Sequence, residues 1–195
     1  MPLPQIDQPL AAVDYAEAQL LRATVDAKHP WHWPVLVTAG AGRVVVLRHY
    51  SSATASLRFF TDRRSAKVSE LADAAGRCSF TFYHPRHRTQ LRVAGSATEL
   101  VDLALRDEFW RKQHVKAQRS YASKEAPGSS IPDPSQAYSK AWMEGRPSDR
   151  ERAAAFANFT VFEVAISTYD LLQLSPDGQR RVGWTAHGTP QWLTP

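Results

Sequence analysis

Apolar residues recur at two different spacings along this chain, and the two spacings separate predicted helices from predicted strands. In the segment 10–27 they approximate one stripe at helical spacing, which predicts a helix within the N-terminal segment, residues 1–30. Helical spacing also follows Ser65, a residue type favoured as a helix N-cap. Two further helices are predicted, over residues 100–114 and within residues 145–159.

Alternating apolar and polar positions predict strands. In the segment 77–84, Cys78 and the phenylalanines alternate with small polar residues, as on a strand with one buried face. The run Val44–Leu47 is apolar on both faces, which is typical of a central strand of a barrel. The other predicted strands are two within residues 34–50 around the Gly40–Gly42 turn, then 55–61, 90–100, 158–167, 179–185 and 190–195.

Short strands joined by turns, with a few helices between them, predict a mainly β fold with α additions, built as an antiparallel β-barrel. The length of 195 residues suggests a single domain, 1–195. Residues 123–139 are rich in Pro, Ser and Gly and are predicted to be loop, inside a loop-rich insertion 122–150. Residues 156–195 then supply the closing strands.

Composition narrows the class of protein without choosing a partner. The formal net charge of +5 favours phosphate, nucleic acid or an acidic surface. One cysteine excludes an internal disulfide and fits a reducing compartment. The start of the chain lacks a signal-peptide pattern, and no apolar run approaches the roughly 20 residues of a membrane helix. We therefore predict a soluble, cytoplasmic protein.

The turn between the predicted strand 55–61 and the following helix concentrates cations and hydroxyl groups. Thr61, Ser65 and Lys67 stand where a helix N-terminus presents unpaired N–H groups, a combination that suits a phosphate. A solvated basic turn with an ordinary cap is the commoner explanation of such a turn taken alone.

Residues on neighbouring strands favour a ligand site over a solvated basic turn. Arg43 and Arg48 bracket an apolar strand, and Gln90 and Arg92 share one face of another. A buried amide needs partners, because an unpaired polar group costs about 1–3 kcal/mol. A planar heterocycle with carbonyls and ring nitrogens would supply them.

Three motifs together resemble a known family. "RVVVLR" at 43–48, "RFFTDRRSAK" at 58–67 and "FYHPRHRTQLRVAG" at 82–95 resemble, in order and spacing, the pyridoxamine 5'-phosphate oxidase family of FMN-binding split β-barrels. The resemblance covers roughly Pro34 to Leu100, and the tail 157–195 more loosely. It implies an FMN cofactor, a small-molecule substrate and a homodimer with the flavin between subunits.

The resemblance also implies which residues bind the cofactor. The implied set is Arg43, Val46, Leu47, Arg48, Phe60, Thr61, Ser65, Ala66, Lys67, Gln90 and Arg181, with Arg180 as the alternative to Arg181. In this set Arg43, Ser65 and Lys67 would bind the phosphate, and Gln90 would hydrogen-bond toward the flavin ring. No catalytic residue is assigned. No metal site is expected, because the pairs His29/His32 and His84/His87 are interpreted as imidazoles scattered in turns.

The chain departs from the family in its phosphate turn and in its substrate region, where Leu172 stands in place of a family tryptophan and the family's Gln-Ser pair has no counterpart in the long loop. The phosphate turn, usually Ser-Arg-Lys, is Ser65-Ala66-Lys67 here, with Arg63 and Arg64 as candidate replacements for the missing arginine. The segment "GQRRVGW" lacks the histidine of the Arg-x-His pair with which the true oxidases handle substrate. The resemblance therefore transfers the flavin site better than the substrate site.

Three functions follow, in order of preference. The first is an FMN-dependent oxidoreductase that transfers a hydride from a small substrate, such as a phosphorylated pyridoxine-type compound, to flavin N5. The second is a flavin-binding protein or flavin reductase without vitamin B6 oxidase activity. For either of these two, a deazaflavin in place of FMN stays open. The third is a single-stranded nucleic-acid-binding barrel, suggested by "FTFYHPRHR". It leaves Gln90 and the Ser65–Lys67 turn unexplained, so neither nucleic acid nor membrane is the expected partner.

Overall fold

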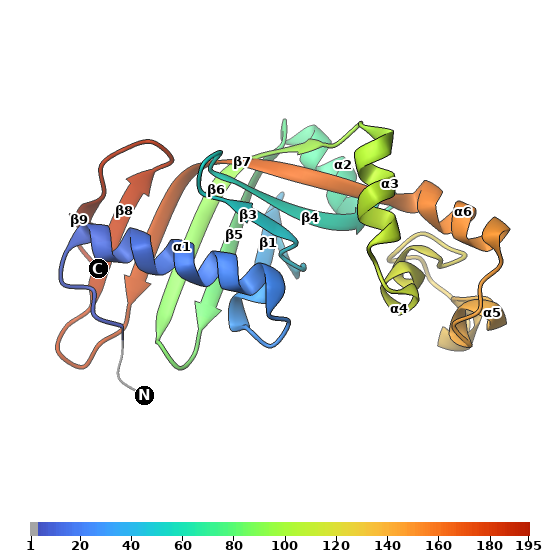
Figure 1. The fold of residues 1–195 in the computed structure, drawn as a ribbon, viewed down its shortest axis with the longest axis horizontal. Helices are drawn as coiled ribbons and strands as arrows, with labels where there is room; N and C mark the ends of the chain where they lie inside the picture. Colours follow the sequence, from blue (N-terminus) through green and yellow to red (C-terminus); the bar gives the residue numbers. More distant parts are fainter. Residues whose placement is uncertain (1–3) are drawn as a thin grey trace.

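A computed structural model describes residues 4–195; residues 1–3, which belong to the predicted N-terminal segment 1–30, lie outside the described residues. Within 4–195, nine strands form one antiparallel sheet with the order β2-β1-β5-β6-β7-β4-β3, and β8 and β9 continue it from β7 (Figure 1). The strands are β1 (Val35–Thr38), β2 (Ala41–Val44), β3 (His49–Ser51), β4 (Ser56–Asp62), β5 (Arg77–His84), β6 (Thr89–Glu99), β7 (Phe159–Gln173), β8 (Arg180–Thr185) and β9 (Gln191–Leu193).

The helices flank this sheet. They are α1 (Pro9–Val25), α2 (Ala66–Asp73), α3 (Leu103–Arg111), α4 (Val115–Gln118), α5 (Lys140–Met143) and α6 (Asp149–Asn158), with short 3-10 turns η1 (Pro30–His32), η2 (Arg119–Tyr121) and η3 (Pro134–Gln136). The sheet is not closed, because β2 and β3 end the path on either side. The predicted mainly β, antiparallel split barrel with α additions is confirmed.

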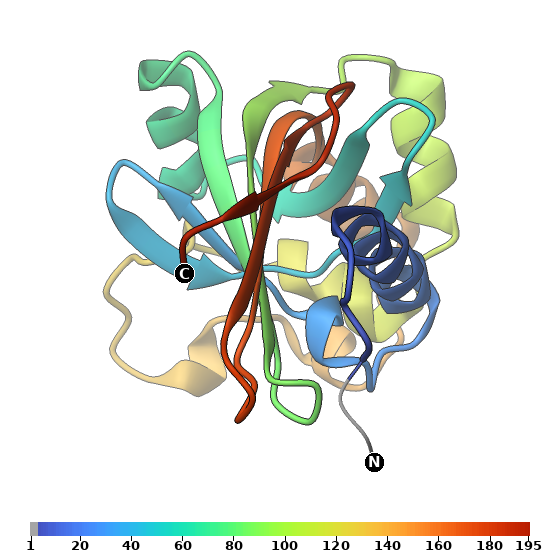
Figure 2. The ribbon, with the colours of Figure 1, turned by 90° about the vertical axis from the view of Figure 1, so that its left-hand side faces the viewer.

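The main core lies between α1 and one face of the sheet. The helix lies across the strands β8, β7, β6 and β5 (Figures 1 and 2). The helix buries Ala12, Ala16, Leu20 and Ala23, at the spacing the sequence predicts. Alanines at these positions let the helix approach the strands closely. Trp31 fills the space beyond the helix end, fully buried, with its ring 5.6 Å from that of Phe82.

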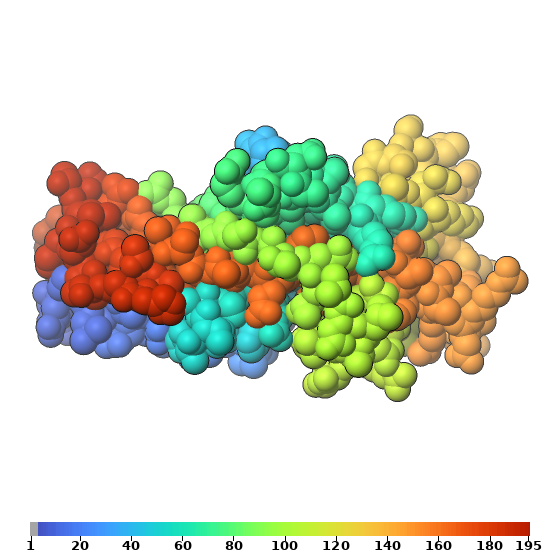
Figure 3. All heavy atoms as spheres, turned by 90° about the horizontal axis from the view of Figure 1, so that it is seen from above, coloured from blue at the N-terminus to red at the C-terminus, as the bar shows by residue number. Residues whose placement is uncertain are grey.

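A smaller aromatic core lies under α3, α6 and the insertion. It contains Trp110, Tyr121, Trp142, Ala155, Phe159 and Val161. Phe159 belongs to the start of β7, so this core anchors the insertion to the sheet. Viewed from above, the insertion lies at one end of an elongated molecule, and α1 with the C-terminal strands lies at the other (Figure 3).

The second face of the sheet is open. Tyr83, Gln90, Leu172, Arg181 and Leu193 pair directly across β5, β6, β7, β8 and β9, so their side chains lie in one row on this face. The exposed apolar residues Val35, Val44, Tyr83 and Leu193 lie on this face and are 36% to 61% exposed. The face therefore retains exposed apolar side chains on both sides of Gln90 and Arg181.

Two expectations about elements are wrong. The run Val44–Leu47 is not a central strand: β2 lies at the sheet edge and ends at Val44, and Val45–Arg48 is irregular, although its amides still bond to neighbouring carbonyls. The strand predicted over residues 158–167 is too short, because β7 continues to Gln173. None of the helices described within 4–195 is long and apolar enough to cross a membrane.

Candidate functional site

The turn between β4 and α2 holds Lys67 against two hydroxyl groups. Its Nζ donates to Thr61 Oγ1 at 2.9 Å and to Ser65 Oγ at 2.7 Å. Ser65 occupies the N-cap position of α2, but its hydroxyl makes no cap bond and instead accepts from Lys67. The first amides of α2 therefore have neither a preceding helical turn nor a side-chain cap to bond to.

Asp62 is the nearest acid in this turn, and it is engaged by Arg64. The Arg64 backbone N–H and Nε donate to Asp62 Oδ1 at 2.9 and 3.0 Å, and Nη2 donates to Oδ2 at 2.7 Å. Asp62 is buried, so this bidentate pair neutralises it in place. Lys67 forms no ion pair with a carboxylate in the described part of the chain.

The electrostatic state of Lys67 fits this isolation. Burial lowers the pKa of its ammonium group, and the positive charge of Arg43 lowers it further, against the smaller opposing effects of Asp62 and Glu70. The charged form of Lys67 is therefore less stable than in water, and an anion beside it would stabilise that form.

A cavity of about 280 Å³ opens beside this turn. One wall is Arg48, whose guanidinium carbon lies 5.3 Å from the centroid of the Phe60 ring. The Nε of Arg48 is buried and has no hydrogen-bond partner within residues 4–195. The cavity thus holds a second cation with unmet hydrogen-bonding capacity, and burial lowers the pKa of this guanidinium.

The segment that leads from α4 into the insertion also lines the cavity. It contributes Ala117, Ser120, Tyr121 and Pro127. Arg64 Nη2 donates to Ser123 O and Ser123 Oγ, both at 3.1 Å, so the pair that neutralises Asp62 also fastens the insertion. Asn158 on α6 adds a bond from Nδ2 to Tyr121 O at 3.0 Å.

The structure brings six of the eleven predicted site residues together. The cavity is lined by Val46, Arg48, Phe60, Thr61, Ser65 and Lys67. Arg43 points elsewhere: its Nη1 pairs with Glu70 Oε2 at 2.7 Å, and Glu70 also accepts from Thr38. Leu47 is buried in the main core, and Ala66 is exposed at the start of α2.

Gln90 and Arg181 lie far from this cavity along β7. Thr61 pairs with Thr160 near the start of β7, whereas Gln90 and Arg181 both pair with Leu172 near its end. The two β7 positions are twelve residues apart, which is up to about 40 Å at roughly 3.3 Å per residue. Neither Gln90 nor Arg181 lines the cavity.

The strand register favours Arg181 over its alternative Arg180 as the companion of Gln90. Arg181 pairs with Leu172 and shares the face of Gln90, whereas Arg180 pairs with the buried Gln173 on the other face. Arg181 is held by Asp170, with Nε–Oδ1 at 3.0 Å and Nη2–Oδ2 at 2.8 Å. This contact fixes its guanidinium on the open face.

Arg63 and Arg64, the candidate replacements for the arginine missing from the phosphate turn, do not line the cavity, and both pair with carboxylates. Arg64 is committed to Asp62 and Ser123, and Arg63 pairs with Glu99 at 2.7 Å.

Sequence reasoning missed the insertion residues and Asp62 as parts of the cavity wall. Tyr121 sits in a stretch that reads as solvated loop, yet it is buried, and burial raises its pKa to about 12. The spacing of the aromatic residues from Trp110 to Tyr121 is the feature of the sequence that could have indicated the burial of Tyr121.

Comparisons with known proteins identify the family and the fold that this chain resembles. Residues 12–101 match the family model described as pyridoxamine 5'-phosphate oxidase, FMN-binding domain, which confirms the resemblance stated from the sequence. Among curated proteins, none matches the chain.

Three solved structures share the fold. The pyridoxamine 5'-phosphate oxidase-related, FMN-binding protein from Nostoc punctiforme aligns with a TM-score of 0.73 at 22% identity, over 100% of both chains. PhzG from Burkholderia lata, in complex with tetrahydrophenazine-1-carboxylic acid, aligns with 0.68 at 18%, over 100% of this chain and 98% of that one. A Clostridium acetobutylicum protein related to general stress protein 26 gives 0.54 at 9%, over 91% and 96%. At these identities the likeness establishes the fold.

Proposed function

We propose that this protein is an FMN-dependent oxidoreductase whose cofactor phosphate is bound at the Ser65 turn. The observation that carries the proposal is the cavity in which Lys67 and Arg48 face the same space with no carboxylate partner within residues 4–195. Each cation paired with a phosphate charge at about 4 Å would gain roughly 4 kcal/mol at an effective dielectric near 20, before desolvation.

The residues present suit such a group. The hydroxyls of Thr61 and Ser65, the ammonium of Lys67 and the first amides of α2 are the donors that would hold a phosphate. The orphaned Nε of Arg48 and the ring of Phe60 offer a donor and an apolar surface to the rest of the molecule. Bound FMN would supply two-electron redox chemistry, and the protein would supply binding, orientation and exclusion of water.

A second copy of the chain would complete the site in this proposal. Gln90 and Arg181 do not line the cavity of their own chain, and the open face that carries them has apolar surface for a partner to cover. A homodimer would place Gln90 and Arg181 of one subunit beside the Ser65 turn of the other. Gln90 would then offer its amide to the flavin ring, and Arg181 would add a positive charge.

Vitamin B6 oxidation is one candidate reaction, and a specific observation favours a different substrate. The β8 segment "GQRRVGW" has Val182, fully buried, and Gly183 after Arg181, so no imidazole reaches the open face there. PhzG shares the fold and was solved with an aromatic carboxylic acid, which makes aromatic acids a substrate class to test here.

The visible absorption spectrum of the purified protein tests the cofactor. We expect bound flavin bands, or quenching of added FMN fluorescence by protein prepared without flavin. A colourless protein that leaves FMN fluorescence unchanged contradicts the proposal. Deazaflavin in the same titration checks cofactor choice.

Substrate choice needs a separate assay. The flavin-loaded protein is incubated with pyridoxamine 5'-phosphate under air. Prompt formation of pyridoxal 5'-phosphate establishes the B6 reaction, and its absence with intact flavin binding favours the flavin reductase or another oxidoreductase.

A further inference from the structure

The two histidine pairs that the sequence separates by more than fifty residues come together in the fold. The His84 and His87 rings stack at 3.8 Å with an interplanar angle of 3°, and the His29 ring stands edge-on to His84 at 5.4 Å. His29 and His84 are buried. The expectation of imidazoles scattered in turns is therefore wrong, because the β5–β6 turn packs against the segment that follows α1.

Hydrogen bonds fix the tautomers of two of these rings. His29 Nδ1 accepts from Trp31 N–H at 3.1 Å, so its Nε2 carries the proton and donates to Gln19 Oε1 at 3.0 Å. His84 Nδ1 accepts from His87 N–H at 3.2 Å, so the proton of neutral His84 is on Nε2. His29 is thus saturated by protein contacts, whereas the Nε2–H of His84 is a donor for which the structure gives no protein partner within residues 4–195.

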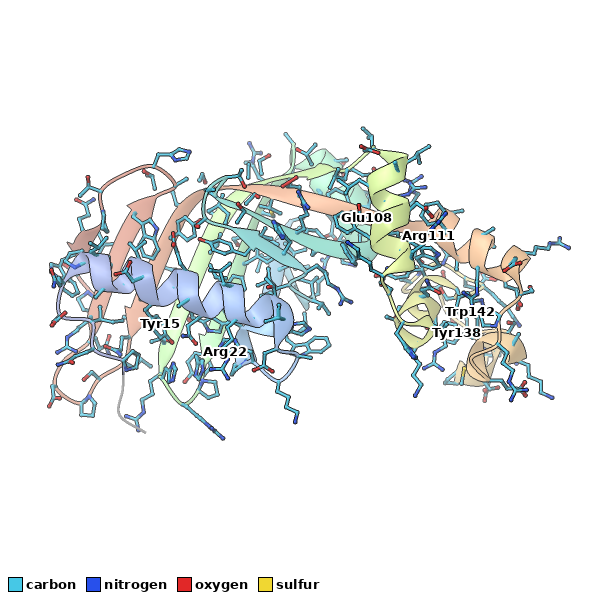
Figure 4. All side chains as sticks on the ribbon, in the orientation of Figure 1. Tyr15, Arg22, Glu108, Arg111, Tyr138 and Trp142 are labelled. Carbon is cyan, nitrogen blue, oxygen red and sulfur yellow. The ribbon has the colours of Figure 1, made fainter. Side chains whose placement is uncertain are left out.

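His87 is held by the helix. Its Nδ1 lies 2.9 Å from Tyr15 Oη, which also bonds to Thr89 Oγ1 at 2.8 Å. Tyr15 and Arg22 project from the same side of α1, toward the β5–β6 turn (Figure 4). The helix therefore positions one imidazole and places one cation beside it.

A cavity of about 550 Å³ lies at this junction. Its walls are Arg22, Asp26, Lys28, His29, Pro30, His84, Pro85, Arg86 and His87. Arg22, Lys28 and Arg86 give it three cations against one carboxylate. Asp26 is already engaged, since its carboxylate accepts from Arg22 Nη2 at 3.4 Å and from Lys28 N–H at 3.0 Å.

The imidazoles are kept neutral in this positive surrounding. Burial, followed by the charges of His87 and His29, lowers the pKa of His84 to about 4. The pKa values of His29 and His87 are lowered as well, by burial first and then by Arg22. The charged or titratable groups that face His84 and His87 are Tyr15, Arg22 and Asp26 from α1, Lys28, His29 and His32 from the segment after it, and Arg86 from the turn.

We propose that this cavity is a binding site for a small phosphate-type anion, distinct from the cavity at the Ser65 turn. The two cavities share no lining residue. Arg22, Lys28 and Arg86 supply charge, and His84 supplies a directed N–H donor. An anion in this cavity favours the imidazolium form of His87 before that of His84, because a protonated His87 Nδ1 can donate to Tyr15 Oη, whereas His84 Nδ1 already accepts from the His87 N–H.

Other ligands fit these walls less well. In residues 4–195 no three histidine, cysteine or acidic side chains are arranged to hold a metal ion, and His29 has both ring nitrogens in use. Single-stranded nucleic acid needs exposed aromatic faces for stacking. Here the His84 ring is buried against its neighbours, so the ligand is a compact ion.

The test is a titration with inorganic pyrophosphate at constant ionic strength, followed through the imidazole NMR signals of His84 and His87. We expect saturable shifts of both signals and an upward change in the pKa of His87. Arg86→Gln should weaken the affinity about tenfold, as expected for one charge-assisted contact. Because the signals belong to this cavity, the result does not depend on whether the Ser65 turn binds FMN.

Arg88→Gln is the matched control, since Arg88 is an exposed cation of the same turn that does not line the cavity. It should change the affinity by less than about twofold, through long-range charge alone. Equal weakening by Arg86→Gln and Arg88→Gln, or His84 and His87 signals that do not move, overturns the proposal. A single-stranded oligonucleotide that moves these signals where pyrophosphate does not also overturns it.

Discussion

Two regions of the candidate site lie at the two ends of β7, and they differ in how far the chain itself encloses them. At the start of β7, the Ser65 turn is enclosed by its own chain: α2, the Arg48 segment and the insertion wall off a cavity lined by unpaired cations. At its end, Gln90 and Arg181 lie in an open row between exposed apolar side chains. The first region can form in a monomer, whereas the second has a function in our proposal only when another copy covers it.

The largest effect is expected from a charge placed on the open face. Val35→Asp should weaken self-association by about 3 kcal/mol or more, because the carboxylate would be buried in the interface without a partner. Analytical ultracentrifugation should show monomers at concentrations where the unmodified protein is dimeric, and FMN binding should weaken in parallel.

The control for this change is Val25→Asp, on an exposed position of α1 and on the covered side of the sheet. It should leave the oligomeric state unaltered. If Val35→Asp protein remains as associated as the Val25→Asp protein, the open face is not the interface.

The Ser65 turn is tested by Lys67→Ala. We expect FMN binding to weaken by about 1.5–3 kcal/mol, the usual worth of a charge-assisted hydrogen bond. Fluorescence titration measures it, with the highly exposed Lys140→Ala as the control of equal charge change. Arg43→Ala should have a smaller effect than Lys67→Ala, because Arg43 is committed to Glu70; the reverse order would place the phosphate nearer β2.

Lowering the pH should reduce stability through His84, which lies near Gln90, and not through the Ser65 turn. The pKa of His84 is lowered from 6.5 to about 4 in the folded protein, so the unfolded chain binds more protons between these values. The contribution of His84 to the free energy of unfolding should therefore fall as the pH decreases from about 6.5 to about 4, and level off below. Urea unfolding across this range measures the slope, and His84→Gln should reduce it. An equal slope in the variant would assign the acid sensitivity to other groups.

The smallest effect is expected at the helix cap. Ser65→Ala should lower the free energy of unfolding by less than about 0.5 kcal/mol, because the Ser65 hydroxyl makes no cap bond. Ser148→Ala, which removes a complete capping box from α6, should cost about 1 kcal/mol. FMN affinity should show the opposite order. A large stability loss in Ser65→Ala would mean that this hydroxyl serves the fold rather than the ligand.

Sequence reasoning succeeded where the determinants are local. Alternation along 77–84 and 90–100 predicted two strands, and the residues from Phe60 to Lys67 are close in sequence, so one turn brings them together. It failed where partners come from distant segments. Glu70 draws Arg43 away from the cavity, and the helix-to-turn packing joins His29 to His84.

The insertion shows the same limit. Its composition predicts loop, but Arg64 bonds to Ser123 at its start, and Tyr121 just before it is bonded by Asn158 and buried by Trp110 and Phe159. None of these contacts has a signature in the local pattern. Sequence propensity describes the preference of an isolated segment. Here packing against β7 determines which residues of the segment are buried.

The central claim, that each flavin site combines the Ser65 turn of one subunit with the open row of the other, is tested most directly by mixing two defective variants. Lys67→Ala and a Gln90→Ala/Arg181→Ala double variant each damage both sites of a homodimer. A mixed dimer of the two would contain one site with both defects and one with neither. We predict that mixing restores one FMN site of unmodified affinity per mixed dimer. If mixed dimers form and bind FMN no better than either variant alone, the site lies within a single chain and the account is wrong.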